Sequence, residues 1–531
     1  MASPSRASCS KLSSKPRISP AQAGLLLLCL AWLLPGLVGH APWKGGDGDH
    51  FVQFLRMLQP GGWVPADGVP PLYYWTAAAT AWLTSPFLPL HDGARLASGV
   101  FVALTLAFTL RTARAWYGPD AGWAAVLTLL GCLGLLVRGH ELNAHTAQFA
   151  AAALMLLGIA RLPAGPRGGA LLAAGTAFML LAGGAAEALV FLLLATAAPL
   201  WLDVHRSPAA RRGLAVALAG SLVFAAAWWA ALAAQGVAPA AALGLDRWLD
   251  AGMLRPAYYL GILGWFAWPA WPLALWALYR GRRPWRTPGL LLPGLGLAGL
   301  LGLYAFVGSP GEERGLILLL PLALLGGAGL LTLRRGAANA LLWFGVMLFG
   351  FIGLVFWVYW GAHDLGSPAR LARRLARLGM TDVGTLRPWA LGLGALVTLL
   401  WIGFLVRVRR SPLRPMLVWT VGLTFIWGLL MALFQGPLDR RLSYAGVAEE
   451  LIARVPADAC IQTHAVRSTQ RQLLAYHSGR FLVPADVGCD WLLMETRQRE
   501  ARPHVSDNWV KQWEGARPGD RSDRFHLYAR R

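Results

Sequence analysis

Apolar runs of about the length of a membrane span follow one another along most of the chain, and short polar stretches separate them. A helix needs roughly 20 apolar residues to cross the hydrocarbon core of a bilayer. The pattern therefore predicts an all-α polytopic membrane protein with about thirteen transmembrane helices. The predicted spans cover residues 21–39, 94–110, 121–137, 146–160, 168–186, 188–202, 213–235, 256–279, 288–307, 315–333, 338–360, 388–406 and 416–434.

Mixed charge and short apolar runs replace the long apolar runs after residue 434. We therefore expect two parts, a multi-span membrane domain over 1–434 and a small α/β domain over 435–531, which is within the normal range of domain sizes. The elements predicted in the second part are helices over 442–454 and 468–477 and strands over 459–463, 491–495 and 524–528.

Charged residues make up 14% of the chain and hydrophobic residues 56%, whereas soluble domains contain roughly 25% charged residues. The net charge of +22 arises because 48 lysines and arginines outnumber 26 acids. The basic residues lie in short clusters between the apolar runs, which is typical of loops that orient membrane spans and not of a nucleic-acid-binding surface. We therefore expect no nucleic-acid partner.

The basic clusters fall in every second loop, and lysine and arginine accumulate in cytoplasmic loops. This pattern predicts a cytoplasmic N-terminus and, with an odd number of spans, a C-terminal domain in the periplasm of a bacterial inner membrane. The basic stretch before residue 21 could also belong to a cleaved signal peptide, but we expect an uncleaved first span. The clusters lie at 111–114, 161–167, 206–212, 280–286, 334–335 and 407–414.

The segment 71–90 is apolar enough to span, but counting it would place every later basic cluster outside. We therefore interpret residues 40–93 as an outer loop with surface helices. The aromatic residues of the segment are typical of a membrane interface. They are Tyr73, Tyr74, Trp75 and Trp82.

The segment 367–379 carries four arginines although it is predicted to lie outside, and its leucines recur at helical spacing. An amphipathic helix on the outer membrane surface fits this pattern. Such a helix would serve either as a headgroup anchor or as a contact for an anionic lipid carrier.

Cys460 and Cys489 both fall in the predicted periplasmic domain. Disulfides persist in such an oxidising compartment, so a bond between these two cysteines is reasonable. Two free thiols remain the alternative, because spacing alone does not establish proximity.

Candidate chemistry begins in the outer loop that follows the first span, where Asp47 and Asp49 lie just beyond the membrane. Acids at this boundary can act as a general base, hold a cation or remain solvated loop residues. From the residues alone, all three interpretations stay open.

Two later outer loops also contain polar islands, at 138–145 and 308–315. Polar side chains between apolar runs are costly unless they face water or one another, so these residues are functional candidates. An arginine such as Arg314 can pair with a phosphate, or with Glu312 or Glu313. Glu187 is a lone acid between two spans, for which we expect a satisfied or water-exposed position. The candidates in the first island are Arg138, His140, Glu141, Asn143 and His145.

The chain contains no Walker loop, G-x-S-x-G elbow, H-E-x-x-H motif, cysteine–histidine cluster or dinucleotide fingerprint. These absences argue against ATP-driven pumping and against chemistry that depends on a soluble cofactor. We expect no required cofactor, although a divalent cation could assist.

The first outer loop has an acid just after the first span, then R-M-L-x-x-G-G-W-V-P, P-P-L-Y-Y-W and A-R-L-A-S-G. With these motifs it resembles the first outer loop of the polyprenyl-phosphate-sugar glycosyltransferases of the GT-C class. The similarity is to the protein O-mannosyltransferase and lipid A aminoarabinose transferase family. It extends to Tyr258-Tyr259 ahead of 265–272, and to Glu313-Arg314 ahead of Leu320-Pro321.

The resemblance implies a cavity at the outer membrane face, where a lipid-phosphate sugar donor meets its acceptor among membrane lipids. Family members use the acid after the first span in catalysis. Asp47 fits that acid best by its spacing to Met57 and Trp63, and Asp49 is second. We expect donor or substrate contacts at Arg56, Arg138, His145, Tyr258, Tyr259 and Arg314.

The chain departs from the family pattern at two positions. Many relatives carry a lysine immediately before Pro-Pro-Leu, and this chain has Val69 there. The second family acid is replaced by Glu141, or by Asn143 and His145 at positions that are not acidic. Either Glu141 substitutes for that acid, or this branch has changed its acceptor or lost activity.

These features predict a glycosyltransferase that moves a sugar from a polyprenyl-phosphate carrier to a lipid, glycan or protein acceptor at the periplasmic face of the inner membrane. One alternative is a transporter or flippase of a lipid-linked molecule, which typically contains inverted repeats. No convincing repeat is visible in the sequence. The other alternative is a non-catalytic relative that acts as an assembly partner.

Overall fold

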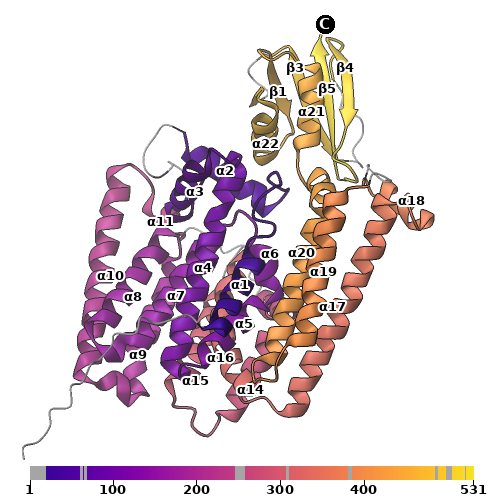
Figure 1. Cartoon of the computed structure of the whole chain (residues 1–531). Coiled ribbons are helices and arrows are strands. Elements are labelled where there is room, and N and C mark those ends of the chain that lie inside the picture. Colours follow the sequence, from indigo (N-terminus) through magenta and orange to yellow (C-terminus); the bar gives the residue numbers. More distant parts are fainter. Residues whose placement is uncertain are drawn as a thin grey trace, which may run out of the picture.

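The protein consists of a helical body with a small sheet domain at one end (Figure 1). The computed structural model describes residues 19–59, 64, 68–245, 257–306, 310–380, 386–484, 488–497, 505–520 and 522–531. The basic N-terminal stretch and, in the first outer loop, Trp63 and Pro65 lie outside the described residues.

Each predicted span coincides with a helix or with a pair of consecutive helices. Within the described residues, seven helices are long and apolar enough to cross a membrane, or eight if α13 and α14, which are bent by 103°, form one span. The chain is therefore a multi-span helical membrane protein, and the number thirteen stays a prediction. The helices are α1 (Pro20–Leu33), α4 (Leu90–Tyr117), α5 (Ala121–Leu130), α6 (Leu133–Arg138), α7 (His145–Arg161), α8 (Pro166–Leu181), α9 (Ala185–Ala197), α10 (Pro208–Ala234), α13 (Ala257–Phe266), α14 (Ala270–Arg280), α15 (Pro288–Tyr304), the 3-10 segment η4 (Glu312–Leu318) with α16 (Leu319–Leu331), α17 (Arg335–Asp364), α19 (Pro388–Arg407) and α20 (Arg414–Leu442).

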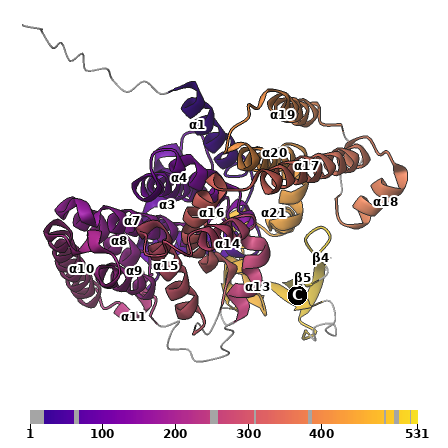
Figure 2. The same cartoon turned by 90° about the horizontal axis from the view of Figure 1, so that it is seen from below.

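The helices differ in how deeply they lie in the body. Helices α7 and α16 are buried over most of their length, whereas α10 and α19 leave most of their surface exposed at opposite sides of the molecule (Figure 2). Glycine allows the close packing of α16, because a Cβ atom at Gly327 would lie 2.6 Å from the backbone nitrogen of Ala125. The central helices thus form a rigid support, and the exposed apolar faces fit lipid.

The outer loop forms two short helices, α2 (Gly46–Met57) and α3 (Pro71–Thr84), before α4 begins at Leu90. Helix α3 has 14 residues and is therefore too short to cross a membrane. The expectation that its aromatic residues form an interface belt is wrong for Tyr73 and Tyr74, which are 1% and 2% exposed. Both tyrosines pack against the core around Phe51 and Phe101, while Trp82, in the last turn of α3, is 78% exposed.

The C-terminal domain contains a five-stranded sheet in the order β2-β1-β3-β5-β4. Strands β2 and β3 pair with β1 in parallel, and β5 is antiparallel to both β3 and β4. The predicted helices and strands are present, but the sequence missed β2 and β4, which are the two edge strands. Helix α20 continues through residue 434 to Leu442. The elements are α21 (Ala445–Arg454), β1 (Cys460–His464), α22 (Ser468–Ser478), β2 (Phe481–Pro484), β3 (Trp491–Arg497), β4 (Trp509–Gly515) and β5 (Asp523–Arg530).

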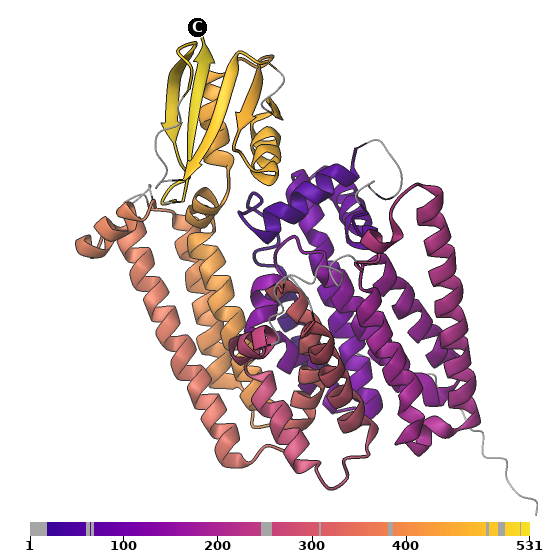
Figure 3. The ribbon, with the colours of Figure 1, turned by 180° about the vertical axis from the view of Figure 1, so that it is seen from behind.

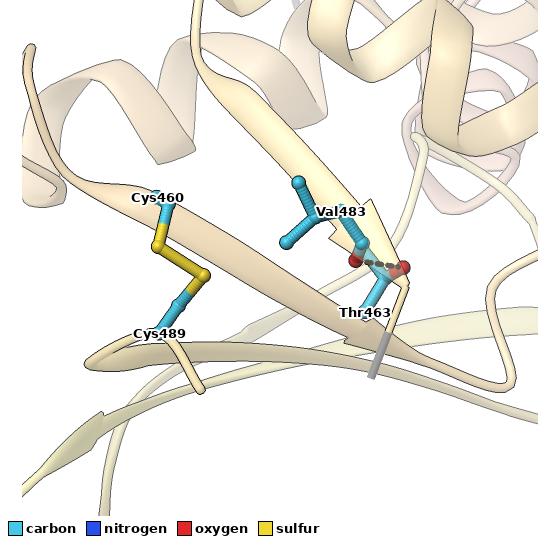
Figure 4. Close-up of a disulfide and its surroundings, with 4 residues drawn as sticks. All are labelled: Cys460, Thr463, Val483 and Cys489. Atoms are coloured by element: carbon cyan, nitrogen blue, oxygen red, sulfur yellow. Dashed lines mark hydrogen bonds between the residues drawn. A yellow bond between two sulfur atoms is a disulfide. The ribbon is translucent and has the colours of Figure 1, made fainter. Parts of the chain in front are cut away.

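A disulfide joins Cys460 at the start of β1 to Cys489 in the loop before β3, with 5.5 Å between the Cα atoms (Figure 4). This is the pairing that the sequence made reasonable. Near the other end of β1, the Thr463 hydroxyl donates to the Val483 carbonyl on β2 at 2.9 Å. The disulfide thus ties β1 to the loop before β3, and the hydrogen bond ties β1 to β2.

The amphipathic segment between the ends of α17 and α19 forms helix α18 (Ala369–Arg377), as predicted. It lies at the same end of the body as α2, α3 and the sheet domain (Figure 3). The loops that carry the candidate chemistry therefore share one face of the molecule with both surface features.

Candidate functional site

Helix α2 carries the candidate site residues of the first outer loop. Its first turn carries Asp47 and Asp49, which complement the positive end of the helix dipole, and Arg56 lies in its last turn. The loop before α2 is anchored by an isolated bridge between Trp43 and Ser443. The position of α2 is thus set by the end of the last membrane helix.

Asp47 belongs to a buried network with Asp92 and Arg95, both on α4; we call these three residues the Arg95 network. Arg95 is completely buried and lies 3.2 Å from Asp47 and 2.8 Å from Asp92. Each oxygen of Asp47 also accepts a backbone N–H, from Leu142 at 2.7 Å and from Trp43 at 2.8 Å. The carboxylate has therefore filled its hydrogen-bonding positions inside the protein.

The charge state of Asp47 follows from these partners. Burial opposes its ionisation, but the positive charge of Arg95, together with His40 and the hydrogen bonds, outweighs burial. The pKa of Asp47 consequently lies below its ordinary value. Asp47 is a fixed anion with 2% of its surface exposed.

The second acid of α2, Asp49, is exposed and points to the C-terminal domain. Its Oδ1 atom accepts a hydrogen bond from the Thr469 hydroxyl on α22 at 2.7 Å. Arg56 reaches the same helix, where its guanidinium donates to the Ser468 hydroxyl at 3.3 Å. These two predicted site residues connect α2 to the C-terminal domain.

A second group of charged residues, which we call the Arg138 cluster, is open to solvent. Arg138 donates to Glu141 and to Glu312, in each case at 2.9 Å, and lies 3.7 Å from Glu313. The Arg138 and Glu141 side chains are each 22% exposed, and that of Glu312 is 33% exposed. The cluster consists of His50, Arg138, Glu141, His145, Glu312 and Glu313.

Glu313 lies where three separate segments of the cluster meet. Its Oε2 atom is 3.4 Å from Nε2 of His50 on α2 and 3.9 Å from Nε2 of His145 on α7. A Cβ atom at Gly46 would collide with Oε1 of Glu313. The missing side chain at Gly46 thus lets this carboxylate approach the N-terminus of α2, where the helix dipole stabilises negative charge.

Glu141 differs from Asp47 in its proton affinity. Burial raises the pKa of Glu141 to about 7, and the charge of Asp47 adds to this effect, although Arg138 opposes it. A carboxylate with a pKa near neutral pH can exchange a proton during a reaction. Glu141 is therefore accessible to solvent and has a pKa that suits proton transfer near neutral pH.

The remaining residues of the first polar island have structural contacts. The ring nitrogens of His140 face the carbonyl oxygens of Leu136 and Trp32, at 2.6 and 2.9 Å, so His140 joins α6 to α1. The Asn143 side chain accepts the N–H of His145 at 3.0 Å and thereby orders the start of α7.

Tyr258 and Tyr259 lie beside the segment η4, which carries the two glutamates and Arg314. The Tyr259 hydroxyl lies 3.2 Å from the carbonyl of Gly311, just before η4, and the rings of Tyr258 and Tyr259 pack edge to face. Glu187 is buried and accepts a hydrogen bond from the Tyr304 hydroxyl at 3.3 Å, so this lone acid has a satisfied position.

The sequence did not identify His50, Asp92 or Arg95 as site residues. His50 could have been found, because it lies about one helical turn after Asp47, on a helix whose last turn carries Arg56. Arg95 belongs to the motif A-R-L-A-S-G, but its partner Asp47 is 48 positions away. Among the residues that the structure describes, no group of three or more histidines, cysteines and acids is arranged to hold a metal ion.

No family model and no curated protein matches the sequence. The structure is similar to the crystal structure of ArnT from Cupriavidus metallidurans bound to undecaprenyl phosphate, with a TM-score of 0.64, 15% identity and coverage of 95% of this chain and 97% of that one. The apo structure of the same ArnT gives a TM-score of 0.61 at 16% identity, covering 90% and 93% of the two chains. The chain therefore has a GT-C fold of the ArnT type, as the resemblance of its outer loops predicted.

Proposed function

We propose that the chain is a glycosyltransferase that moves a sugar from a polyprenyl-phosphate carrier to a lipid, glycan or protein acceptor at the periplasmic face of the bacterial inner membrane. The observation that carries this proposal is the Arg138 cluster, an open group of charged side chains at one end of an ArnT-like helical body. The undecaprenyl phosphate in one of the similar ArnT structures supports a polyprenyl-phosphate donor. The positive-inside pattern of the loops supports the periplasmic side.

The reaction requires three events at one place. An acceptor oxygen forms a bond to the anomeric carbon, and the bond from that carbon to the phosphate oxygen breaks, with its electron pair leaving on the phosphate. The acceptor proton passes to a base. Arg138 is suited to the phosphate, because a guanidinium pairs with phosphate oxygens through parallel hydrogen bonds. It would supply the positive charge that many relatives place at the position of Val69.

We assign the proton-accepting role to Glu141, with Glu313 as the second carboxylate of the site. Glu141 is reachable from solvent and its pKa is raised to about 7. Glu313 contacts both histidines of the cluster, which can carry a proton onward. Tyr258, Tyr259 and Arg314 adjoin this group and remain candidate donor contacts.

Asp47 is assigned a positioning role. The carboxylate accepts the N–H of Leu142, the residue that follows Glu141. It therefore holds the loop that carries the base while its own oxygens stay occupied by Arg95. Asp49 and Arg56 are assigned to the contact with the C-terminal domain.

The test uses the full-length protein in lipid nanodiscs with radiolabelled polyprenyl-phosphate sugars and a bacterial membrane extract as acceptor. We expect transfer by the wild type and a loss of about 100-fold or more in Glu141→Gln, in line with the contribution of a general base. The control is Glu450→Gln, an exposed side chain on α21, which should retain full transfer. Failure of transfer with every donor would contradict the proposal.

A flippase for a lipid-linked molecule is the second candidate, and the sharp break between α13 and α14 favours it. Transporters often place broken helices at their substrate sites. In proteoliposomes without an acceptor, a flippase would move a fluorescent polyprenyl-phosphate sugar between leaflets. A glycosyltransferase would leave it where it was added.

A further inference from the structure

Helix α18 lies between the ends of two membrane helices. It follows α17, whose last residue is Asp364, and precedes α19, which begins at Pro388. Figures 1 and 2 show it projecting sideways from the ends of these helices, away from the rest of the body. This position places α18 at the level where a bilayer meets water.

The helix has two chemically different faces. Ala372 and Leu375 are 6% and 2% exposed and face the protein. The opposite face carries four exposed arginines at spacings of three and four residues, which bring them onto one side of a helix. They are Arg370, Arg373, Arg374 and Arg377.

The four guanidinium groups form no ion pair with any residue of the described chain. Nearby Arg387, by contrast, is bound to Asp364 at 2.6 Å and 3.1 Å. An arginine in this region can thus be paired with an acid of the protein, but the four arginines of α18 have no such partner among the described residues. Their positive charge is directed outward, on the side of the molecule where the positive-inside pattern predicts few arginines.

Apolar side chains mark the same level of the molecule. Leu365, at the end of α17, and Trp389, in the first turn of α19, are 57% and 62% exposed. Leu378 is 38% exposed directly after α18. Tryptophan is enriched at membrane interfaces, where its ring lies at the level of the headgroups. The arginines are therefore placed beside lipid headgroups rather than in bulk water.

We propose that α18 is a binding site for the phosphodiester headgroups of anionic bilayer lipids. Guanidinium groups form charge-assisted, bidentate hydrogen bonds with phosphate oxygens, and clustered arginines favour anionic over zwitterionic lipid. The proposal does not depend on the glycosyltransferase function.

The site would also hold the C-terminal domain at the membrane. A Cβ atom at Gly379, just after α18, would collide with the backbone of Gly519, so the two backbones are in direct contact. The adjacent Asp520 lies 3.6 Å from Lys44 of the first outer loop. Lipid bound to α18 would therefore stabilise the corner at which the C-terminal domain meets the membrane part.

The experiment reports on α18 alone. A fluorophore is attached at Ala376→Cys, which is exposed on α18, in full-length protein with Cys9 and Cys29 replaced by serine. The protein is placed in phosphatidylcholine nanodiscs that contain a small fraction of spin-labelled phosphatidylglycerol or spin-labelled phosphatidylcholine. We expect at least twofold stronger quenching by phosphatidylglycerol, and no competition by inorganic phosphate at the same concentration.

Replacing the four arginines of α18 by glutamine should remove the preference for phosphatidylglycerol, and lysine at the same positions should retain most of it. A matched control removes the same charge from the end of α14 and the loop that follows it, through Arg280→Gln, Arg282→Gln, Arg283→Gln and Arg286→Gln, and should leave the α18 signal unchanged. Equal quenching by both lipids in the wild type would overturn the proposal. Competition by inorganic phosphate would also overturn it, because the site would then bind free phosphate.

Discussion

Arg95 and Arg138 are each surrounded by carboxylates, and the two groups differ in their access to water. In the Arg95 network, the arginine and both of its aspartates are buried, and every charged side chain is at most 4% exposed. In the Arg138 cluster, the arginine and its glutamates are 22–33% exposed. The same types of residue therefore serve different purposes.

The difference in burial explains why the Arg95 network and the Arg138 cluster are suited to different roles. Charges that are removed from water are stable only when their partners are complete, so the Arg95 network is committed to structure. Partly exposed ion pairs contribute roughly 0–1 kcal/mol and can be exchanged for a ligand at little cost. The Arg138 cluster can thus exchange its internal partners for a ligand, whereas the Arg95 network holds the backbone at Leu142, beside Glu141 of that cluster.

The largest effect is expected for Arg95→Gln, which leaves Asp47 and Asp92 as buried carboxylates without their cation. Breaking a buried pair in this way costs about 3–5 kcal/mol of unfolding free energy. Thermal unfolding in detergent would show a strongly lowered midpoint. The control is Arg206→Gln, whose pair with Asp203 is exposed, and whose midpoint should change little. Equal midpoints for both variants would contradict the structural role of the network.

The next effect concerns Arg138→Gln in the open cluster. Because its partners are partly solvated, we expect less than about 1 kcal/mol of destabilisation. The apparent affinity for the polyprenyl-phosphate donor should fall about tenfold or more, since a charge-assisted contact to phosphate is lost. Donor titrations and unfolding curves on the same preparation would separate the change in donor affinity from the change in stability. Strong destabilisation without loss of donor affinity would show that Arg138 has a structural role and does not bind the donor.

A smaller effect is expected for Gly46→Ala. The new methyl group would displace the flexible end of Glu313 from its place between His50 and Arg138, so transfer should fall a few-fold while the fold is retained. Sugar transfer under saturating donor would measure the change. The matched control is Gly446→Ala on α21, where the added methyl group meets open space. An unchanged rate in Gly46→Ala would show that the position of Glu313 does not matter.

The sequence predicted the helical body well because long apolar runs report directly on membrane spans, and no tertiary contact is needed to recognise them. The edge strands β2 and β4 were missed because neither strand has a fully buried residue, which weakens the hydrophobic pattern of both. Tyr73 and Tyr74 were assigned to the membrane interface because their burial against α2 and α4 depends on tertiary packing.

The division between the two arginine groups could not be predicted for a similar reason. Asp47 and Asp49 are two positions apart on α2, so they point to different sides of the helix. Which side faces Arg95 and which faces α22 is decided by elements that are distant in sequence. Likewise Glu313 reaches His50 across 263 positions. Local spacing identified the polar islands but not their partners.

The pH dependence of sugar transfer tests most directly the claim that catalysis belongs to the Arg138 cluster. A base must be ionised to accept a proton, so the wild-type rate should rise with pH through about 7, the pKa of Glu141. In Glu141→Gln the rate should be low and should lack this rise, whereas in Asp47→Asn the folded fraction should retain it. A rise that persists in Glu141→Gln but disappears in Asp47→Asn would contradict the account.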